Sequence, residues 1–242
     1  HVFRTRCDTE AIVHGYEEWG DDVVSRLDGM FAFALWDTRR ERLLLARDHA
    51  GKKPLYVRHT DEGLAFASDA RAALLVAGAA PAVDEEGLAA FLFQRYAVAP
   101  RTLFAGVERL QPGHLLAYDR RSGATQRVFW KLRPPRETVP LAPTELRELL
   151  REGVRKRLMS DVPLGVLLSG GVDSAAVLGL ARESGAEHLD TFTIGFSDTA
   201  YDERPQARLS AERHGARHHE VVVDPRSFAA THHYVFSMAD AD

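Results

Sequence analysis

Hydrophobic and polar positions follow one pattern in the first half of the chain and another in the second. In the first half, short runs that alternate or are rich in apolar residues lie between turn residues, as is typical of strands. They predict six strands, at 30–36, 42–47, 54–59, 64–68, 114–118 and 127–131. The first four follow one another through short turns, which predicts that they form one antiparallel sheet.

Helical spacing of apolar residues lies between these strands. It predicts helices over 8–19, 21–27, 69–78 and 84–96. Asp8 is placed to cap the first helix at its N-terminus. The last of the four is expected to bury Leu88, Phe91 and Leu92.

From residue 144 onward, helix and strand patterns alternate. Helices are predicted over 144–159, 173–184 and 202–214, and strands over 162–168, 190–196 and 218–223. This order is typical of parallel strands joined by crossover helices, a doubly wound α/β domain. In the helix 173–184, the expected inward stripe is Ala176, Val177, Leu180 and Ala181, with Gly185 at its C-terminal end.

A proline-rich segment separates the two patterns. Residues 134–143 contain four prolines in ten positions, which favours a linker. We therefore predict a first domain over 1–135, a linker over 136–143 and a second domain over 144–242.

Composition narrows the possible classes of protein. The 242 residues carry 31 basic and 35 acidic side chains, a net charge of −4, so nothing favours nucleic acid or an acidic membrane as a partner. The chain has no apolar run as long as a membrane span and no signal peptide. The single cysteine, Cys7, excludes an internal disulfide framework and fits a cytoplasmic location.

The strongest candidate for chemistry is the sequence that follows the strand 162–168. Ser169, Gly170 and Gly171 form a turn before a helix that starts near Asp173 and Ser174. The amides of such a turn and the positive end of the helix dipole bind anions. Asp173 is suited to a Mg²⁺ ion that bridges phosphates, and the absence of a lysine excludes a Walker A loop. The alternative is a strand-to-helix turn that merely requires glycine.

S-G-G-V-D-S at 169–174 resembles the pyrophosphate loop of ATP pyrophosphatases. Together with five other stretches in the same order, it makes the chain similar to the glutamine-dependent asparagine synthetase family (the asparagine synthetase B type). Those stretches are R-L-D-G-M-F-A-F-A-L-W-D (26–37), A-R-D-H-A-G-K-K-P-L-Y (46–56), the A-S-D-A-R-A segment at 67–72, L-Q-P-G-H-L-L (110–116) and F-T-I-G-F (192–196). The resemblance implies an N-terminal-nucleophile glutaminase domain with antiparallel sheets and helices, followed by a doubly wound α/β ATP pyrophosphatase-like domain.

The resemblance also implies an activity. A ligase of this family uses ATP and Mg²⁺ to adenylate the side chain of aspartate, and ammonia from glutamine then gives asparagine, AMP and pyrophosphate. Glutamine, aspartate and ATP would be the small-molecule substrates. The oligomeric state stays open, with a homodimer as one option.

Individual residues match family positions as follows. Asp8 matches the acid that holds the α-amino group of glutamine. Ser169, Gly170, Gly171, Asp173 and Ser174 match the ATP pyrophosphate loop, with Asp173 as the Mg²⁺ ligand. Leu167 and Ile194 match positions near the nucleotide, although ordinary core positions would explain both.

The family's catalytic nucleophile is a cysteine at the mature N-terminus. Residue 1 here is His, and Cys7 is expected to be a packed or incidental thiol. We therefore read the chain as an internal fragment without its own catalytic nucleophile, inactive by itself. Two alternatives stay open, namely a related synthetase that adenylates another carboxylate, as β-lactam synthetases do, and a non-catalytic relative that binds nucleotide.

Overall fold

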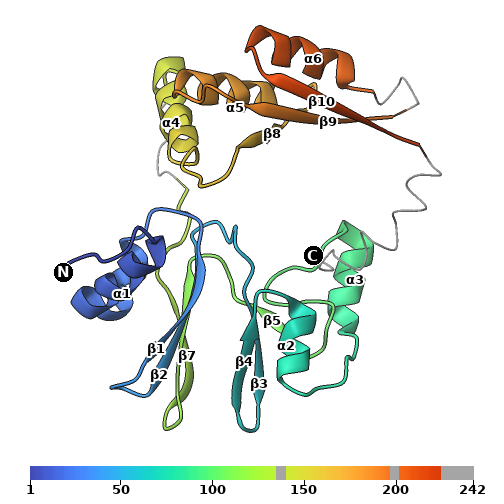
Figure 1. Ribbon diagram of the computed structural model, residues 1–242. Coiled ribbons are helices and arrows are strands. Elements are labelled where there is room, and N and C mark those ends of the chain that lie inside the picture. Colours follow the sequence, from blue (N-terminus) through green and yellow to red (C-terminus); the bar gives the residue numbers. More distant parts are fainter. Residues whose placement is uncertain (135–139, 197–201, 225–242) are drawn as a thin grey trace. The chain divides into compact units, whose positions relative to one another are not determined.

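The computed structural model describes residues 1–134, 140–196 and 202–224 (Figure 1). They form two compact units, one made of residues 1–134 and one made of the described residues from 140 to 224. The first unit contains antiparallel sheets and the second a parallel sheet, so the chain is mixed α/β, as its two patterns predict. Among the described residues, no helix has the length and apolar character needed to cross a membrane.

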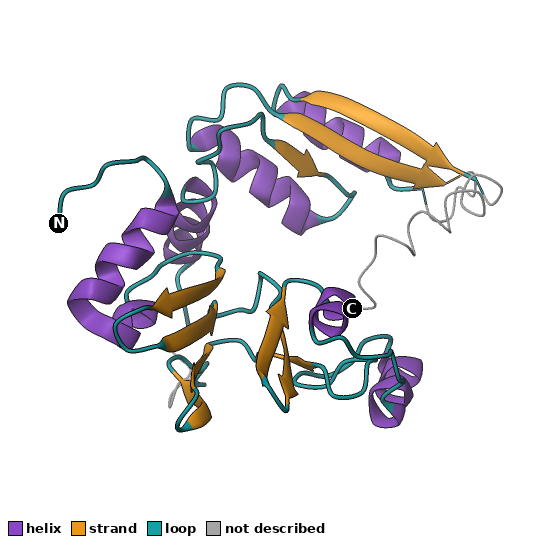
Figure 2. Ribbon diagram, turned by 60° about the horizontal axis from the view of Figure 1, so that its bottom comes forward, coloured by secondary structure: helices purple, strands orange, loops and turns teal. Residues whose placement is uncertain are grey.

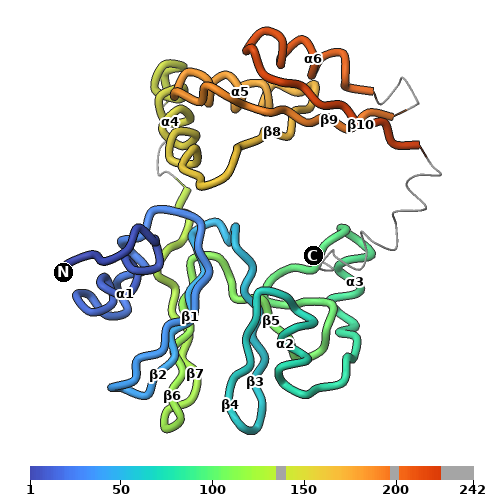
Figure 3. The backbone as a smooth tube through the Cα atoms, viewed as in Figure 1, coloured from blue at the N-terminus to red at the C-terminus, as the bar shows by residue number. Residues whose placement is uncertain are grey.

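The first unit has two antiparallel sheets, whose hairpins can be traced in Figure 3. The larger sheet has the strand order β1-β2-β6-β7 and the smaller one the order β4-β3-β5. The strands are β1 (Ala32–Asp37), β2 (Arg42–Arg47), β3 (Tyr56–Thr60), β4 (Gly63–Ala67), β5 (Glu108–Arg109), β6 (His114–Asp119) and β7 (Gly123–Val128). The expected single sheet of the first four strands is wrong. Both edges of β2 are occupied, by β1 and β6, so the hairpin β3–β4 belongs to a second sheet.

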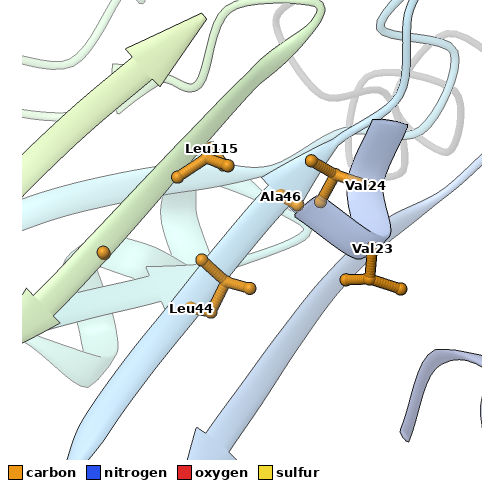
Figure 4. Packing of buried hydrophobic residues seen from close by; sticks show 6 residues of the cluster. Val23, Val24, Leu44, Ala46 and Leu115 are labelled. Carbon is orange, nitrogen blue, oxygen red and sulfur yellow. The ribbon is translucent and has the colours of Figure 1, made fainter. Parts of the chain in front are cut away.

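Three apolar clusters show how this unit is layered. One face of the larger sheet packs against the 3₁₀ helix η1 (Gly20–Ser25), where Val23 and Val24 meet Leu44, Ala46 and Leu115 (Figure 4). The other face packs on the smaller sheet through the cluster of Leu45, Leu55, Val57, Leu110 and Leu116. The far face of the smaller sheet contacts helix α2 (Ala70–Val76) through Tyr56, Ala73 and Leu74. The larger sheet is therefore covered on both faces.

The helices of this unit differ from expectation in detail. Helix α1 (Asp8–Trp19) has Cys7 as its N-cap, so Asp8 is its first residue and not its cap. Helix α3 (Glu85–Gln94) is capped by the Asp84 carboxylate, which accepts the Gly87 N–H at 2.7 Å. Its predicted burial is wrong, because Leu88 and Leu92 are 38% and 70% exposed. The residue of α3 that faces inward is Gly87, where a Cβ would overlap the Thr102 carbonyl.

The last residue of β2 and the first residue after it are charged and lie in the core. The buried Asp48 carboxylate accepts the N–H groups of Phe31, Ala50, Lys52 and Lys53 at 2.9–3.3 Å. The Arg47 guanidinium donates to the carbonyls of Lys53, Gly51 and Leu110, each at 2.7 Å. These two residues explain much of the A-R-D-H-A-G-K-K-P-L-Y sequence as a structural device, since buried charges require such hydrogen bonding.

The second unit is a parallel sheet with the strand order β10-β9-β8 (Figure 2). Its elements are α4 (Pro143–Arg155), β8 (Gly165–Leu167), α5 (Val172–Glu183), β9 (Asp190–Phe196), α6 (Arg204–Arg213) and β10 (Arg217–Val223). The predicted alternation of helices and strands is confirmed. Helix α4 begins at Pro143, which suits a first helical position because its missing N–H needs no partner there. Of the predicted linker, residues 136–139 lie outside the described residues.

The two faces of this sheet differ in burial. Every second residue of β9 is buried and faces the core formed with α5 and α6, namely Thr191, Thr193 and Gly195. Phe192, Ile194 and Phe196 alternate on the opposite face and are 43–61% exposed. The inward stripe of α5 is also shifted from the prediction: Leu178, Leu180 and Ala181 are buried, whereas Ala176 and Val177 are exposed.

Candidate functional site

The loop 169–174 lies at the carboxyl end of β8 and runs directly into α5. Leu168, the last residue before the loop, is buried, and its N–H donates to the Phe192 carbonyl at 2.9 Å. Its own carbonyl accepts the Thr193 hydroxyl at 2.5 Å. The neighbouring strand β9 thus fixes the start of the loop at the edge where open α/β sheets bind ligands.

The loop is closed by its own two serines. The Ser174 hydroxyl lies 2.9 Å from the Ser169 hydroxyl and accepts the Ser169 N–H at 3.1 Å. The Ser169 hydroxyl accepts the Gly171 N–H at 3.2 Å. Gly171 is the N-cap of α5 and no side chain caps that helix, so its first-turn amides point out without an intrahelical acceptor.

A second element, the start of α6, reaches the same loop. The Glu203 carboxylate accepts the Gly170 N–H at 3.2 Å. A Cβ on Gly170 would lie 3.1 Å from the Gln206 Cβ and 3.2 Å from the Glu203 Cβ, so α6 passes close above this glycine. The requirement for glycine therefore comes from the approach of α6.

The end of β9 has a similar close approach. A Cβ on Gly195 would overlap the side chain of Arg204, the first residue of α6. The Arg204 guanidinium donates to both carboxylate oxygens of Asp202, at 2.7 and 2.8 Å. This pair lowers the pKa of Asp202 and raises that of Arg204, in each case chiefly through the hydrogen bonds between them.

Leu167 and Ile194, the two apolar residues that match family positions near the nucleotide, are exposed and do not belong to the core. Leu167 is 83% exposed at the end of β8, and Ile194 is 61% exposed on β9. Both belong to strands that are hydrogen-bonded to each other in register, Leu167 opposite Phe192. Ordinary core packing therefore does not explain these residues. An apolar cavity of about 450 Å³ lies elsewhere, between α4, β8 and α5, and its lining includes none of the loop residues.

Asp173 lies in the first turn of α5, and its carboxylate is exposed. In the described part of the chain, no side-chain hydrogen bond or ion pair engages it. The only group of three or more His, Cys, Asp or Glu side chains there with ligand atoms close enough to share an ion is His1, His14 and Glu17, which excludes Asp173. Asp173 and the Ser174 hydroxyl are nevertheless hard oxygen donors of the kind that Mg²⁺ prefers. Mg²⁺ commonly takes only one or two protein carboxylates and completes its shell with phosphates and water.

His218 and His219 are adjacent residues of β10, and their side chains lie on opposite faces of the sheet. His218 Nδ1 lies 2.8 Å from the Thr191 hydroxyl, on the buried face. The His219 ring stacks on Phe192, on the open face. The two rings therefore do not converge on one point. The pair His232-His233 lies outside the described residues.

In the first unit, Asp8 and Cys7 are both exposed, so of the two expectations for Cys7, a packed or an incidental thiol, the packed one is wrong. Cys7 Sγ lies 3.7 Å from Asp8 Oδ1. The better-held acid is Glu10, which accepts the N–H groups of Arg4 and Thr5 at 2.7 Å and the Thr5 hydroxyl at 2.5 Å. These bonds, first that of the hydroxyl, lower the pKa of Glu10 to about 2. Glu10 thereby fixes the segment that leads to Asp8.

Sequence reasoning missed three residues of these two regions. Glu10 stands three positions after the N-cap, where a capping-box glutamate is expected, and this spacing could have identified it. Glu203 and Arg204 fall within the predicted helix 202–214, but neither of them was assigned a role from the sequence. Glu203 contacts Gly170, 33 positions earlier, and Arg204 contacts Gly195, 9 positions earlier. No local pattern in the sequence indicates that α6 passes close to these glycines.

Comparison with known proteins finds two family models that match successive parts of the chain. The model of the glutamine amidotransferase domain family matches residues 1–130, and the asparagine synthase family model matches residues 145–241. A Mycobacterium bovis protein provisionally named a glutamine-hydrolysing asparagine synthetase is 37% identical over 95% of this chain. Asparagine synthetase (glutamine-hydrolysing) 3 of Bacillus subtilis is 30% identical over 93% of this chain. Amidase chyE of Penicillium rubens is 32% identical over 92%.

The chain therefore joins a region that matches the glutamine amidotransferase domain family to a region that matches the asparagine synthase family. It belongs to the family of glutamine-hydrolysing asparagine synthetases. It covers 36%, 39% and 36% of the lengths of the three relatives above, so it spans little more than a third of each.

Proposed function

We propose that the protein is a ligase that makes asparagine from aspartate, with glutamine as the source of ammonia and ATP cleaved to AMP and pyrophosphate. The observation that carries this proposal is the loop 169–174, set between β8 and α5 in a chain of the asparagine synthetase family. Adenylation of a carboxylate expels pyrophosphate, and amides, hydroxyls and a helix N-terminus meet the charge that develops on it. We assign the first domain to residues 1–135, the linker to 136–143 and the second domain to 144–242.

In this proposal each element of the loop has a distinct task. The first-turn amides of α5 and the Ser169 and Ser174 hydroxyls bind the phosphate oxygens, while Gly170 and Gly171 allow the backbone to approach them. Leu167 and Ile194 offer an exposed apolar surface beside the loop, which suits a nucleoside. Asp173 would hold Mg²⁺ at the start of α5, and the ion would supply charge neutralisation on the phosphates when bound.

The first unit would supply the glutamine site. Asp8 carries a negative charge at an exposed position, and Glu10 fixes the segment before it. An exposed carboxylate of this kind suits the α-ammonium group of glutamine. Cys7 does not fit the role of an amine-assisted nucleophile, because that mechanism uses the amine of the same residue as the base.

The nucleotide assignment is tested by calorimetric titration of ATP with and without Mg²⁺. We expect binding that depends on Mg²⁺, and Asp173→Ala should remove that dependence. Glu212→Ala, which removes an equal charge from an exposed position on α6, is the matched control and should bind like the parent. Equal affinity for ATP with and without Mg²⁺ in the parent would contradict the assignment.

A second candidate is a synthetase that adenylates a carboxylate other than aspartate. The similarity to Amidase chyE, a relative whose name is not that of an asparagine synthetase, favours keeping it. Pyrophosphate and amide products should be measured with aspartate and with other carboxylic acids in the protein that carries this chain. Pyrophosphate release with aspartate, accompanied by asparagine, supports the first candidate. Release only with another acid supports the second.

A further inference from the structure

We propose that Glu203 occupies the phosphate loop until nucleotide binds, and that it makes the loop prefer metal-complexed phosphate to free phosphate. The inference rests on the proposed function, because it concerns the same loop. It assigns Glu203 a positioning role, since the residue acts through the Gly170 amide.

The contact itself is specific. Glu203 Oε2 accepts the Gly170 N–H at 3.2 Å across 33 residues of sequence. The close approach of the Glu203 and Gln206 Cβ positions to Gly170 holds the start of α6 over the loop. The carboxylate thus lies on one of the amides that would otherwise face a phosphate oxygen.

Two other loop amides are also occupied, but by groups of a different kind. The Ser169 and Gly171 amides donate to the Ser174 and Ser169 hydroxyls. A hydroxyl is neutral and can rotate to donate to a phosphate oxygen, whereas a carboxylate can only accept and repels the phosphate. Glu203 is therefore the one of these three acceptors that opposes an incoming anion.

Nearby cations do not neutralise this carboxylate. The adjacent Arg204 directs its guanidinium to both oxygens of Asp202. Among residues 1–134, 140–196 and 202–224, no ion pair involves Glu203. A free phosphate must then displace Glu203 and remain near its charge. A phosphate that carries a divalent cation brings the compensating charge with it.

The test measures pyrophosphate binding by calorimetry, once with a chelator and once with Mg²⁺. Glu203→Gln keeps the size and the acceptor oxygen but removes the charge. We expect it to bind metal-free pyrophosphate roughly fivefold more tightly than the parent, as expected for one unit charge about 4 Å away when water fully screens the interaction. Its affinity for the Mg²⁺ complex should change less than twofold. The matched control Glu212→Gln removes the same charge from the same helix and should alter neither affinity.

A second measurement needs no ligand. The NMR shift of the Gly170 amide should differ between the parent, where the Glu203 carboxylate accepts this N–H, and Glu203→Ala, where the acceptor is removed. Glu203→Ala is thus the variant that vacates the amide, whereas Glu203→Gln removes only the charge, and spectra of both variants verify their folding.

The outcomes separate the two proposals. If the parent binds Mg²⁺–ATP through Asp173 but Glu203→Gln leaves metal-free affinity unchanged, this inference fails and the proposed function stands. Equal tightening by Glu212→Gln also overturns it, because the effect would then be one of overall charge. If the parent binds neither Mg²⁺–ATP nor pyrophosphate, the proposed function fails together with it.

Discussion

Strands β2 and β9 each pair with a neighbouring strand on both edges, yet they bury their side chains in different ways. Antiparallel strands commonly have one wet face, and parallel strands are commonly covered on both. Here the antiparallel β2 buries Leu44, Leu45 and Ala46 in succession, and the parallel β9 alternates between buried and exposed positions. The cause lies in the layers: a helix and a second sheet cover the two faces around β2, whereas α5 and α6 pack on only one face of β9.

The comparison shows where each unit can place a binding group. In the first unit, the candidate residues Cys7 and Asp8 are exposed at the start of α1 and do not belong to a strand. In the second unit, Leu167 and Ile194 lie on the strands themselves, on the open side of the sheet. An uncovered face leaves apolar strand residues available to a ligand, and a doubly covered one does not.

The largest expected effect comes from the doubly covered strand. Leu44→Ala, at a side chain that is 1% exposed, should lower the free energy of unfolding of the first unit by about 3 kcal/mol. All three tryptophans belong to this unit, so fluorescence in a urea titration reports on it alone. Leu92→Ala, at a 70% exposed position on α3, is the control and should change stability by less than about 0.5 kcal/mol.

The next effect concerns the covered face of β9. Gly195→Ala would force the Arg204 side chain away from its place over the strand, at a cost of about 1–3 kcal/mol. Hydrogen exchange of the β9 amides measures this change within the second unit. Gly153→Ala on α4 has open space around the new methyl group and should instead stabilise by about 0.5–1 kcal/mol. If both variants changed the stability of the second unit in the same direction, the packing described at Gly195 would be contradicted.

A smaller effect is expected on the open face of β9. Ile194→Ala should lower stability by less than about 1 kcal/mol, because the side chain is 61% exposed. Hydrogen exchange of the same strand gives the value. A loss as large as that of Leu44→Ala would show that this face is covered in solution, and the contrast between the two strands would then disappear.

The smallest effects are those of two partly buried carboxylates, one in each unit. The pKa of Glu10 is lowered to about 2, chiefly by the Thr5 hydroxyl and backbone N–H groups, and that of Asp190 to about 2, chiefly by the Arg217 guanidinium and His219. A lowered pKa in the folded chain contributes stability that is present above the ordinary value of about 4 and is lost as the pH falls toward 2. NMR titration should show that 1 M salt raises the pKa of Asp190 more than that of Glu10, because salt screens an exposed ion pair. Equal changes in the two pKa values on adding salt would mean that the ion pair of Asp190 and the neutral hydrogen bonds of Glu10 do not differ in their response to screening.

Elements with a clear periodic pattern could be predicted from the sequence. The strands 42–47 and 190–196 were predicted residue for residue, and the turn at 169–171 was placed correctly between β8 and α5. Such predictions succeed because alternation and glycine turns are local properties. The pairing of the first four strands was not predicted correctly, since it depends on β6, which lies about 70 residues after β2.

Side-chain orientation was harder to predict than the elements themselves. The burial of Leu88 and Leu92 was wrong because Gly87, which has no side chain to mark it as a buried position, provides the close contact with residue 102. The contact of Glu203 with Gly170 likewise depends on how α6 crosses the loop. A helical pattern defines which residues share a face, but only the tertiary packing decides which face turns inward.

The hydrogen bond from Arg47 to the Leu110 carbonyl, which spans 63 residues, also restricts the order in which the first unit can mature during synthesis. The hairpin of β1 and β2 can pair as soon as its own residues are available, yet the guanidinium next to it lacks one of its three carbonyl acceptors until residue 110 has been added. At about 5–20 residues per second, translation needs roughly 3–13 s to cover that distance. During this interval the charged end of β2 stays hydrated, and the nascent hairpin cannot yet be sealed against the second sheet.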